Sequence, residues 1–187
     1  MHALWGSLWK GRVKIFPKSE VNRVFLAIGS NIRPEYYLPQ AAHLLSEYGV
    51  VSGKSSVWQS KPVGDLNQAD FLNAAVLLET SYDASQIISE VISGIECKLH
   101  RVRDPKNKNG PRTIDIDLVL FNDEQLQFEH RIIPDPDIMH RDFLAVPLSE
   151  LAPEYCVPGL DKNLGQIASE LTAGAGTQLI RRGDLSL

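Results

Sequence analysis

Short apolar runs separated by turn residues dominate the hydrophobic pattern of this chain. The run Val24–Ile28 ends at Gly29-Ser30-Asn31, which predicts a buried strand that leaves its sheet at a turn. The segments Val50–Trp58 and Phe71–Thr80 are also predicted as strands, joined by a polar connection rich in turn residues. A further strand is predicted at Thr113–Phe121.

Three other segments show helical spacing of their apolar residues. The first helix is expected after the first strand, with Pro39 tolerable only in its first turn and Gly49 as its terminator. In the second helix, Asp83 and Gln86 resemble a capping box. The apolar positions that share a face are Leu38, Ala42 and Leu45 in the first helix, Ile88, Ile92, Ile95 and Leu99 in the second, and Leu164, Ile167, Ala168 and Leu171 in the last.

The remaining segments are polar or rich in proline. Arg101–Pro111 contains one aliphatic residue, so it is expected to bury little and to be mobile without a ligand. After a turn at Asn122-Asp123, a Pro-rich segment leads to Phe143 and to a short helix that opens at Pro147. The charged, glycine-containing C-terminus is expected to fray.

The order strand, helix, strand, strand, helix, strand predicts an α+β fold. We expect a ferredoxin-like α/β sandwich with a mainly antiparallel sheet, helices packed on it and mobile loops. A chain of 187 residues without an internal repeat or linker suits one compact domain. The prediction is therefore a single domain over residues 23–187, preceded by an N-terminal extension at residues 1–22 whose role is not assigned. The extension is basic, but its apolar part is too short and too interrupted for a targeting peptide.

Composition and charge exclude several classes of protein. With 43% hydrophobic and 22% charged residues, the chain is typical of a soluble globular protein, and no segment is long and apolar enough to cross a bilayer. A net charge of -4 gives no general attraction to nucleic acid, so an anionic ligand needs a local cationic cluster. Cys97 and Cys156 have neither CxxC spacing nor enough partners for a disulfide framework or zinc site, and the simplest interpretation is a reducing cytoplasm.

Two acids occupy alternate positions of the strand predicted at Thr113–Phe121. Because strand side chains alternate between faces, Asp115 and Asp117 share a face, and a cation would relieve their repulsion. Mg²⁺ is the natural candidate, since it prefers hard oxygen ligands. The alternative is that both acids form the solvated face of an edge strand. The residues expected on the opposite face are Ile114, Ile116, Leu118 and Leu120.

A cationic loop leads directly to this acid pair. It contains Arg101, Arg103, Lys106, Lys108 and Arg112. Such a loop can fold over a polyphosphate, with guanidinium groups binding its oxygens while metal ions bridge them. The alternative, that the loop is merely soluble, explains its composition but not its placement.

Four motifs carry a family resemblance. They are Ala27-Ile28-Gly29-Ser30-Asn31, Phe71-Leu72-Asn73-Ala74-Ala75-Val76, Arg101-x-Arg103 and Gly110-Pro111-Arg112-Thr113-Ile114-Asp115-Ile116-Asp117. In order and spacing they resemble the 6-hydroxymethyl-7,8-dihydropterin pyrophosphokinase family, over most of the chain. The last string is very specific, whereas each of the others is weak alone.

The resemblance implies transfer of the terminal pyrophosphoryl group of ATP to the hydroxymethyl group of the dihydropterin, releasing AMP, in folate biosynthesis. It implies two Mg²⁺ ions on Asp115 and Asp117, ATP as co-substrate, and mobile catalytic loops. The residues implied to be catalytic are Arg101, Arg103, Arg112, Asp115 and Asp117, and those implied at the nucleotide are Glu96, Leu118, His130 and Arg141. Small-molecule substrates, a cytoplasmic location and a monomer or weak homo-oligomer are expected, with no nucleic-acid or membrane partner.

The same resemblance implies a pterin between Phe71 and Phe143, with Asn73 offering a donor and an acceptor to its edge. Gly29, Ser60 and Val63 would complete that pocket. Taken alone, each Phe is more often a core residue.

Two positions depart from the family pattern. Asn109 stands where the family commonly has Trp before Gly-Pro-Arg, and Asp135 stands where it typically has the His of Pro-His-Pro. An acid beside ATP repels it unless a metal or arginine intervenes, and His130 or His140 is a candidate to compensate. These departures leave open a non-catalytic paralogue that binds pterin or nucleotide as a regulatory or interaction module. A third reading, an α+β RNA-binding domain, is disfavoured by the acidic charge and the lack of a basic face with interleaved aromatics.

Overall fold

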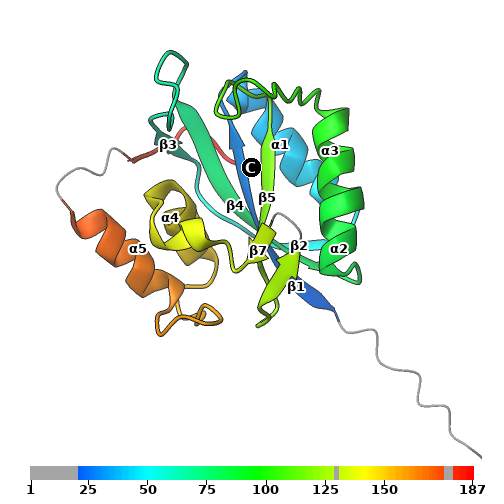
Figure 1. The fold of residues 1–187 in the computed structure, drawn as a ribbon, viewed down its shortest axis with the longest axis vertical. Helices are drawn as coiled ribbons and strands as arrows, with labels where there is room; N and C mark the ends of the chain where they lie inside the picture. Colours follow the sequence, from blue (N-terminus) through cyan, green and yellow to red (C-terminus); the bar gives the residue numbers. More distant parts are fainter. Residues whose placement is uncertain (1–20, 129–130, 175–178) are drawn as a thin grey trace, which may run out of the picture.

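The computed structural model describes residues 21–128, 131–174 and 179–187. Most of the predicted N-terminal extension, at residues 1–20, lies outside these ranges, so the extension stays a prediction. The described chain forms a central sheet with helices on both faces (Figure 1). Its elements are β1 (Asn22–Ser30), α1 (Pro34–Leu45), β2 (Val50–Lys54), β3 (Trp58–Ser60), β4 (Phe71–Thr80), α2 (Ala84–Gln86), the π-helical η1 (Ile87–Ile92), α3 (Ser93–Lys98), β5 (Asp115–Phe121), β6 (Leu126–Phe128), β7 (Arg131–Ile133), the 3-10 helix η2 (Pro136–Met139), α4 (Asp142–Leu151), α5 (Leu164–Ala173) and β8 (Ile180–Arg181).

The main sheet has the strand order β5-β1-β4-β3-β8, and β2 also pairs with β4. All of these pairs are antiparallel. The strand β1 pairs with β4 from Asn22 opposite Thr80 to Ser30 opposite Leu72, and it pairs with β5 on its other edge. This arrangement confirms the predicted α+β sandwich with a mainly antiparallel sheet.

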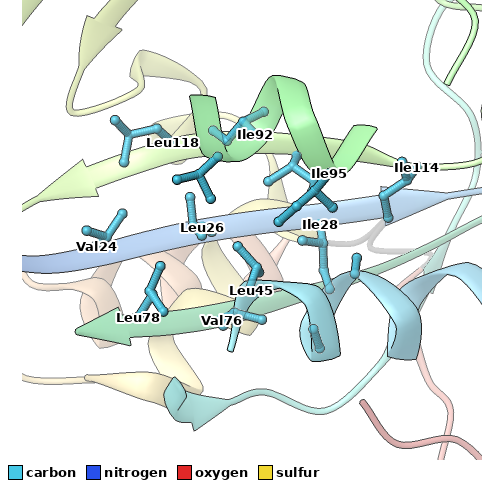
Figure 2. Close-up of a cluster of buried hydrophobic side chains, with 14 of the residues drawn as sticks. Val24, Leu26, Ile28, Leu45, Val76, Leu78, Ile92, Ile95, Ile114 and Leu118 are labelled. Carbon is cyan, nitrogen blue, oxygen red and sulfur yellow. The ribbon is translucent and has the colours of Figure 1, made fainter. Parts of the chain in front are cut away.

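The larger core lies between the sheet and the helices α1 and α2–η1–α3. Alternate side chains of β1, β4 and β5 meet the apolar faces of these helices there (Figure 2). Fully or almost fully buried members are Val24, Leu26, Ile28, Leu45, Val76, Leu78, Ile92, Ile95, Ile114 and Leu118. Each such side chain stabilises the fold by about 1.5–3 kcal/mol relative to exposure.

The helices α4 and α5 pack on the other face of the sheet and form a second core. Its sheet residues are Phe25, Ala75, Leu77, Val119 and Leu120. Because consecutive residues of a strand point to opposite faces, β1 contributes to both cores. The N-terminal end of α4 borders the cavity described below.

Two prolines lie deeper inside helices than the sequence predicts. The helix α1 begins at Pro34, so Pro39 lies in its second turn rather than its first. The helix α4 begins at Asp142, so it does not open at Pro147. Both predictions are wrong because proline forfeits only one main-chain hydrogen bond, and the buried faces of these helices offset that loss.

The capping box that opens the second helix is confirmed: Gln86 N donates to Asp83 Oδ1 at 2.9 Å, and Asp83 N donates to Gln86 Oε1 at 3.0 Å. The π-helical turn that follows widens the helix and shifts its face. As a result Ile87 is fully buried, whereas Ile88 is only partly buried. The predicted burial of Ile92, Ile95 and Leu99 is confirmed.

The predicted strand Val50–Trp58 is interrupted between β2 and β3. At the interruption, the Ser55 hydroxyl accepts a hydrogen bond from Ala75 N at 2.8 Å, so a side chain replaces part of the ladder. Pairing of β2 itself shifts register between Val51 and Gly53. The prediction of one continuous strand is therefore wrong.

The strand β5 contains a bulge that changes the facing of Leu120. Leu26 pairs with Leu118 and Phe25 pairs with Leu120, which leaves Val119 as an extra residue. Leu120 consequently points into the core under α4 and α5 and does not share the face of Ile116. The predicted alternation is confirmed from Ile114 to Leu118, the part that carries both acids.

The C-terminal region contains strands that the hydrophobic pattern does not predict. A hairpin of β6 and β7 precedes Pro134, and β8 pairs with β3 through Arg181 opposite Trp58, while the fraying of the C-terminus stays a prediction. No regular element spans residues 101–112, as predicted, while the mobility of this loop stays a prediction. None of the helices within the described ranges has the length and apolar character to span a membrane.

Candidate active site

One row of residues in register crosses the sheet from β3 to β5. Trp58 lies opposite Asn73, Asn73 opposite Gly29, and Gly29 opposite Asp115. Because residues in register share a face, Asn73 and Asp115 project from the same side of the sheet with Gly29 between them. A Cβ atom at Gly29 would lie 3.1 Å from Asn73 Oδ1, so a side chain there would crowd the amide.

A cavity of about 270 Å³ opens over this row of residues. All six residues implied to bind the pterin line it: Gly29, Ser60, Val63, Phe71, Asn73 and Phe143. Four residues implied to act on phosphate, metal or nucleotide also line it: Arg112, Asp115, Asp117 and Arg141. The sheet therefore brings motifs from β1, β4, β5 and α4 to one concave site.

The end of the cavity at β3 and β4 combines aromatic walls with a fixed amide. Asn73 Nδ2 donates to Ser60 Oγ at 2.9 Å, and both residues are buried. The Arg112 guanidinium lies 5.7 Å from the centroid of the Phe71 ring. A flat heterocycle suits this end, since aromatic faces stack on it and the amide can bind its polar edge.

The other end of the cavity is built around the Asp115 carboxylate, which two arginines hold. Arg101 Nη2 lies 3.0 Å from Asp115 Oδ1, and Arg112 Nη1 contacts Asp115 Oδ2. The Arg101 side chain is 8% exposed and donates to the Ile114 carbonyl at 2.6 Å through Nη1. These contacts fix the orientation of Asp115.

The negative charge of Asp117 is less well neutralised by neighbouring cations than that of Asp115. Burial, followed by the charge of Asp115, raises the pKa of Asp117 to about 6, while Arg131 at 3.4 Å opposes the shift. Asp135, whose own pKa is raised mainly by burial, adds to the repulsion. A bound cation would remove this strain, because opposite charge favours the ionised carboxylate.

The carboxylates fit Mg²⁺ only as partial ligands. Within the described residues, no group of three or more Asp, Glu, His or Cys side chains is arranged to hold a metal ion by itself. Mg²⁺ commonly takes one or two protein carboxylates and completes its octahedron with water and phosphate oxygens. Asp115 and Asp117, on one face of β5 and open to the cavity, match that requirement.

The loop of residues 101–112 folds against the loop of residues 61–70. Asn107 Nδ2 donates to Asp65 Oδ2 at 3.0 Å, and Gln68 Nε2 donates to the Asn109 carbonyl at 2.7 Å. Gln68 Oε1 in turn accepts from Asn31 Nδ2 at 2.8 Å. Asn109, the residue that departs from the family pattern, thus lies where the two loops meet and lines the cavity.

Several implied site residues lie away from the cavity wall. Arg103 Nη2 donates to Glu96 Oε2 at 2.6 Å, and the Arg103 side chain is 67% exposed. Leu118 is fully buried in the core on the opposite face of β5. His130 lies outside the described residues. By contrast Asp135, the second departure from the family pattern, does line the cavity, and it caps η2, where it accepts from Asp137 N at 2.9 Å.

Three charged residues at the site were not indicated by the sequence. Arg131 reaches Asp117 from β7, a short strand that the hydrophobic pattern does not predict. Lys61 lines the cavity and pairs with Asp70 at 3.1 Å. Asp137 lines it and lies 3.8 Å from Arg141. Only tertiary pairing brings these residues to the site, so no local motif signals them.

Comparisons with known proteins identify the family of this chain. Residues 25–153 match the family model of 7,8-dihydro-6-hydroxymethylpterin-pyrophosphokinase (HPPK). The 2-amino-4-hydroxy-6-hydroxymethyldihydropteridine pyrophosphokinase of Bacillus subtilis is 40% identical over 133 residues, 70% of this chain and 78% of the relative. The protein of the same name from Methylorubrum extorquens is 35% identical over 142 residues, 74% of this chain and 88% of the relative.

Solved structures show the same fold. In the Plasmodium falciparum HPPK-DHPS A437G crystal structure with SDX-DHP, the matched region has a TM-score of 0.65 at 16% identity. It covers 82% of this chain and 46% of that chain, so the match spans less than half of the HPPK-DHPS protein.

The family model and the relatives thus define a diphosphokinase that acts on a pterin. The chain belongs to the 7,8-dihydro-6-hydroxymethylpterin-pyrophosphokinase family, and its function is transfer of pyrophosphate from ATP to hydroxymethyldihydropterin in folate biosynthesis.

Proposed function

We propose that the transfer takes place in the cavity over Asn73, Gly29 and Asp115, and that it depends on two Mg²⁺ ions. The observation that carries this proposal is that one cavity joins an aromatic, amide-lined end to an end formed by paired carboxylates and arginines. The first end suits a pterin and the second suits a magnesium-bound polyphosphate. The hydroxymethyl group would then lie at the junction, next to the phosphoryl group that it attacks.

The pterin is proposed to lie between Phe71 and Phe143 with its edge on Asn73. The Ser60 hydroxyl supports this role, because it accepts one N–H of the Asn73 amide and leaves the amide oxygen and the other N–H for the ligand. Gly29 keeps the floor of the pocket open, and Val63 closes its rim.

Asp115 and Asp117 are proposed to hold both Mg²⁺ ions together with phosphate oxygens. When bound, the metal ions supply charge neutralisation and hold the polyphosphate oxygens in a fixed geometry. Asp117 is the carboxylate whose raised pKa calls for a cation, and Asp115 is already oriented by Arg101 and Arg112.

The arginines are proposed to have two roles, orienting the metal-binding carboxylate and binding the phosphates. Arg101 is buried and committed to Asp115, so it orients a metal ligand. Arg112 lines the cavity but also holds Asp115 and donates to the carbonyls of Gly110 and Lys108, so it supports the metal ligand as well as facing the phosphates. The largely exposed Arg103 is free to turn toward polyphosphate oxygens, and Arg141 faces the same cavity from the start of α4. Phosphoryl transfer needs mainly alignment and charge stabilisation, so the described cavity residues need not include a nucleophile.

The test of the proposal is an assay of the purified chain with ATP, Mg²⁺ and 6-hydroxymethyl-7,8-dihydropterin. We expect AMP and the pterin diphosphate in equal amounts, and loss of both products when Mg²⁺ is chelated. AMP formation that needs no pterin contradicts the proposal. Binding of pterin or nucleotide without turnover would support the alternative of a non-catalytic paralogue.

A further inference from the structure

Glu96 lies at the free edge of the strand that carries Asp115 and Asp117. The strand β5 is the last in the sheet order, so in the described structure its outer edge has no strand partner. Ile116 N donates to Glu96 Oε1 at 3.1 Å on this edge, and the Ile114 carbonyl accepts from Arg101 Nη1 at 2.6 Å. Side chains of Glu96 and Arg101 therefore replace the missing neighbouring strand.

The position of the Glu96 carboxylate is fixed on every side. Its side chain is 6% exposed, and its second oxygen, Oε2, accepts from Arg103 Nη2 at 2.6 Å. Glu96 belongs to α3, whose neighbouring residue Ile95 is fully buried in the main core. The Glu96 carbonyl also accepts from Arg101 N at 2.9 Å. A buried carboxylate with both oxygens engaged is a rigid acceptor rather than a group free to bind a ligand.

Ile116 is the residue between the two acids. On the inner edge of β5, Asp115 and Asp117 are in register with Gly29 and Ala27 of β1. The outer hydrogen bond from Ile116 N to Glu96 therefore anchors the backbone midway between the two carboxylates. Mg²⁺ demands near-ideal octahedral geometry, so a small shift of either carboxylate weakens the site.

We infer that Glu96 is a positioning residue: its hydrogen bond to the Ile116 amide sets the spacing of Asp115 and Asp117, and it touches neither metal nor nucleotide. This inference rests on the proposed magnesium role of the two aspartates. It assigns Glu96 a function different from the nucleotide contact that the family resemblance implies.

Two conservative variants distinguish the effect of the length of the Glu96 side chain from the effect of its charge. Glu96→Gln keeps the length of the side chain and an oxygen acceptor for Ile116 N, but it removes the charge. Glu96→Asp keeps the charge but withdraws the acceptor by about one carbon–carbon bond, ~1.5 Å. Glu90→Asp, at an exposed position of the π-helical η1 that precedes α3, is the matched control.

The first measurement is hydrogen exchange of the Ile116 amide in the full, metal-free chain. We expect wild type, Glu96→Gln and Glu90→Asp to protect this amide, and Glu96→Asp to exchange it about 10-fold faster, as for loss of one buried hydrogen bond. The second measurement is the Mg²⁺ concentration that gives half-maximal turnover. We expect it to rise about 10-fold in Glu96→Asp and to stay within about 3-fold in Glu96→Gln, with an unchanged KM for the pterin.

The inference is overturned if Glu96→Gln impairs the enzyme more than Glu96→Asp does. If Glu96→Gln raises the Mg²⁺ requirement or the ATP KM more than Glu96→Asp does, the charge of Glu96 acts on the ligands directly. Should Glu96→Asp fail to fold, Glu96→Gln still decides: a normal Mg²⁺ requirement with a protected Ile116 amide supports the inference, and a 10-fold higher requirement contradicts it. The exchange measurement needs no turnover, so failure of the proposed function and failure of this inference can be told apart.

Discussion

Arg101 and Asp115 form a buried ion pair, with Nη2 of Arg101 3.0 Å from Oδ1 of Asp115 and 8% of the arginine side chain exposed. The same guanidinium donates to the Ile114 carbonyl at 2.6 Å. Within the described residues, its Nε–H has no hydrogen-bond partner. Burial lowers the pKa of Arg101, while Asp115 opposes that shift, and the guanidinium stays protonated at any physiological pH. The positive charge of Arg101 pairs with Asp115, and its planar guanidinium reaches the Ile114 carbonyl at the same time.

Replacing Arg101 with lysine should therefore cost much of the activity. An ammonium group cannot reach Asp115 and the Ile114 carbonyl in the same fixed geometry, so Asp115 loses its orientation. We expect kcat to fall by about 10²–10³-fold, as for loss of a preorganised charge in an active site. Steady-state kinetics with saturating ATP and pterin give the answer. Lys162→Ala, which breaks an exposed ion pair with Glu170, is the control, and a kcat of Arg101→Lys near the wild-type value contradicts the account.

Replacing Asn73 with leucine should weaken pterin binding selectively. The substitution keeps the size of the side chain but removes the amide that faces the cavity and leaves Ser60 without its 2.9 Å partner. We expect the KM for the pterin to rise by about 10–100-fold, with a much smaller change in the KM for ATP. Ser52→Ala on β2 serves as a control for a polar change in the same sheet. Equal changes in the two KM values would show that Asn73 acts on the fold rather than on the pterin.

The raised pKa of Asp117 predicts how metal use depends on pH. A proton and Mg²⁺ compete for the same carboxylate, so the Mg²⁺ requirement should be flat above about pH 6, the pKa of Asp117, and should rise as pH falls below it. Arg131 lowers this pKa, so Arg131→Ala should move the rise to higher pH. Turnover measured against Mg²⁺ concentration from acid to neutral pH tests both statements. An unchanged profile in Arg131→Ala contradicts them.

The same shift has a consequence for stability in the absence of metal. The pKa of Asp117 is about 6 in the folded state and about 3.8 in the unfolded state. The folded state therefore holds the proton more tightly, and the stability that this proton contributes is complete below pH 3.8 and is lost as pH rises through about 6. Asp117→Asn stays neutral throughout, and it should melt at a higher temperature than wild type at pH 8 but not at pH 4. Thermal melts with a metal chelator measure this difference. A lower melting temperature of the variant at pH 8 would sink the assignment, although partial solvent exposure keeps the effect small.

Gln68 should couple the two loops over the cavity. It donates to the Asn109 carbonyl at 2.7 Å and accepts from Asn31 at 2.8 Å, so it joins the loop of residues 61–70 to the loop of residues 101–112. We expect Gln68→Ala to raise the KM for both substrates by about 3–10-fold, because the contacts to Asn109 and Asn31 are both lost. Asn67→Ala is the matched control, since Asn67 contributes only its main-chain N–H to Asp65 in this region. A change confined to one substrate would show that the loops act independently.

The sequence predicts the central fold well wherever pattern and burial agree. The capping box at Asp83, the buried run at Val24–Ile28 and the paired acids on one face of β5 are all local signals, and the structure confirms them. Errors occur where tertiary packing overrides local preference. Pro39 and Pro147 lie inside helices because buried apolar faces offset a lost hydrogen bond.

The candidate site is predicted less evenly than the fold. Motifs on β1, β4 and β5 indicate the residues that meet at the cavity, because strands in register bring distant segments to one face. Arg131 and the contact between Gln68 and Asn109 depend on how short, irregular segments pack, and no periodicity encodes that. The main-chain role of Glu96 is hidden for the same reason, because it requires knowing that β5 is an edge strand.

The most direct test of the central claim compares wild type with Asp115→Asn and Asp117→Asn in one assay of AMP and pterin diphosphate. Each asparagine keeps the shape of the side chain but removes the charge that would bind Mg²⁺. The account predicts that wild type forms both products only with Mg²⁺, and that each variant loses at least about 10²-fold in kcat while both substrates still bind. Near-normal turnover by either variant would contradict the proposal that the two aspartates hold the metal.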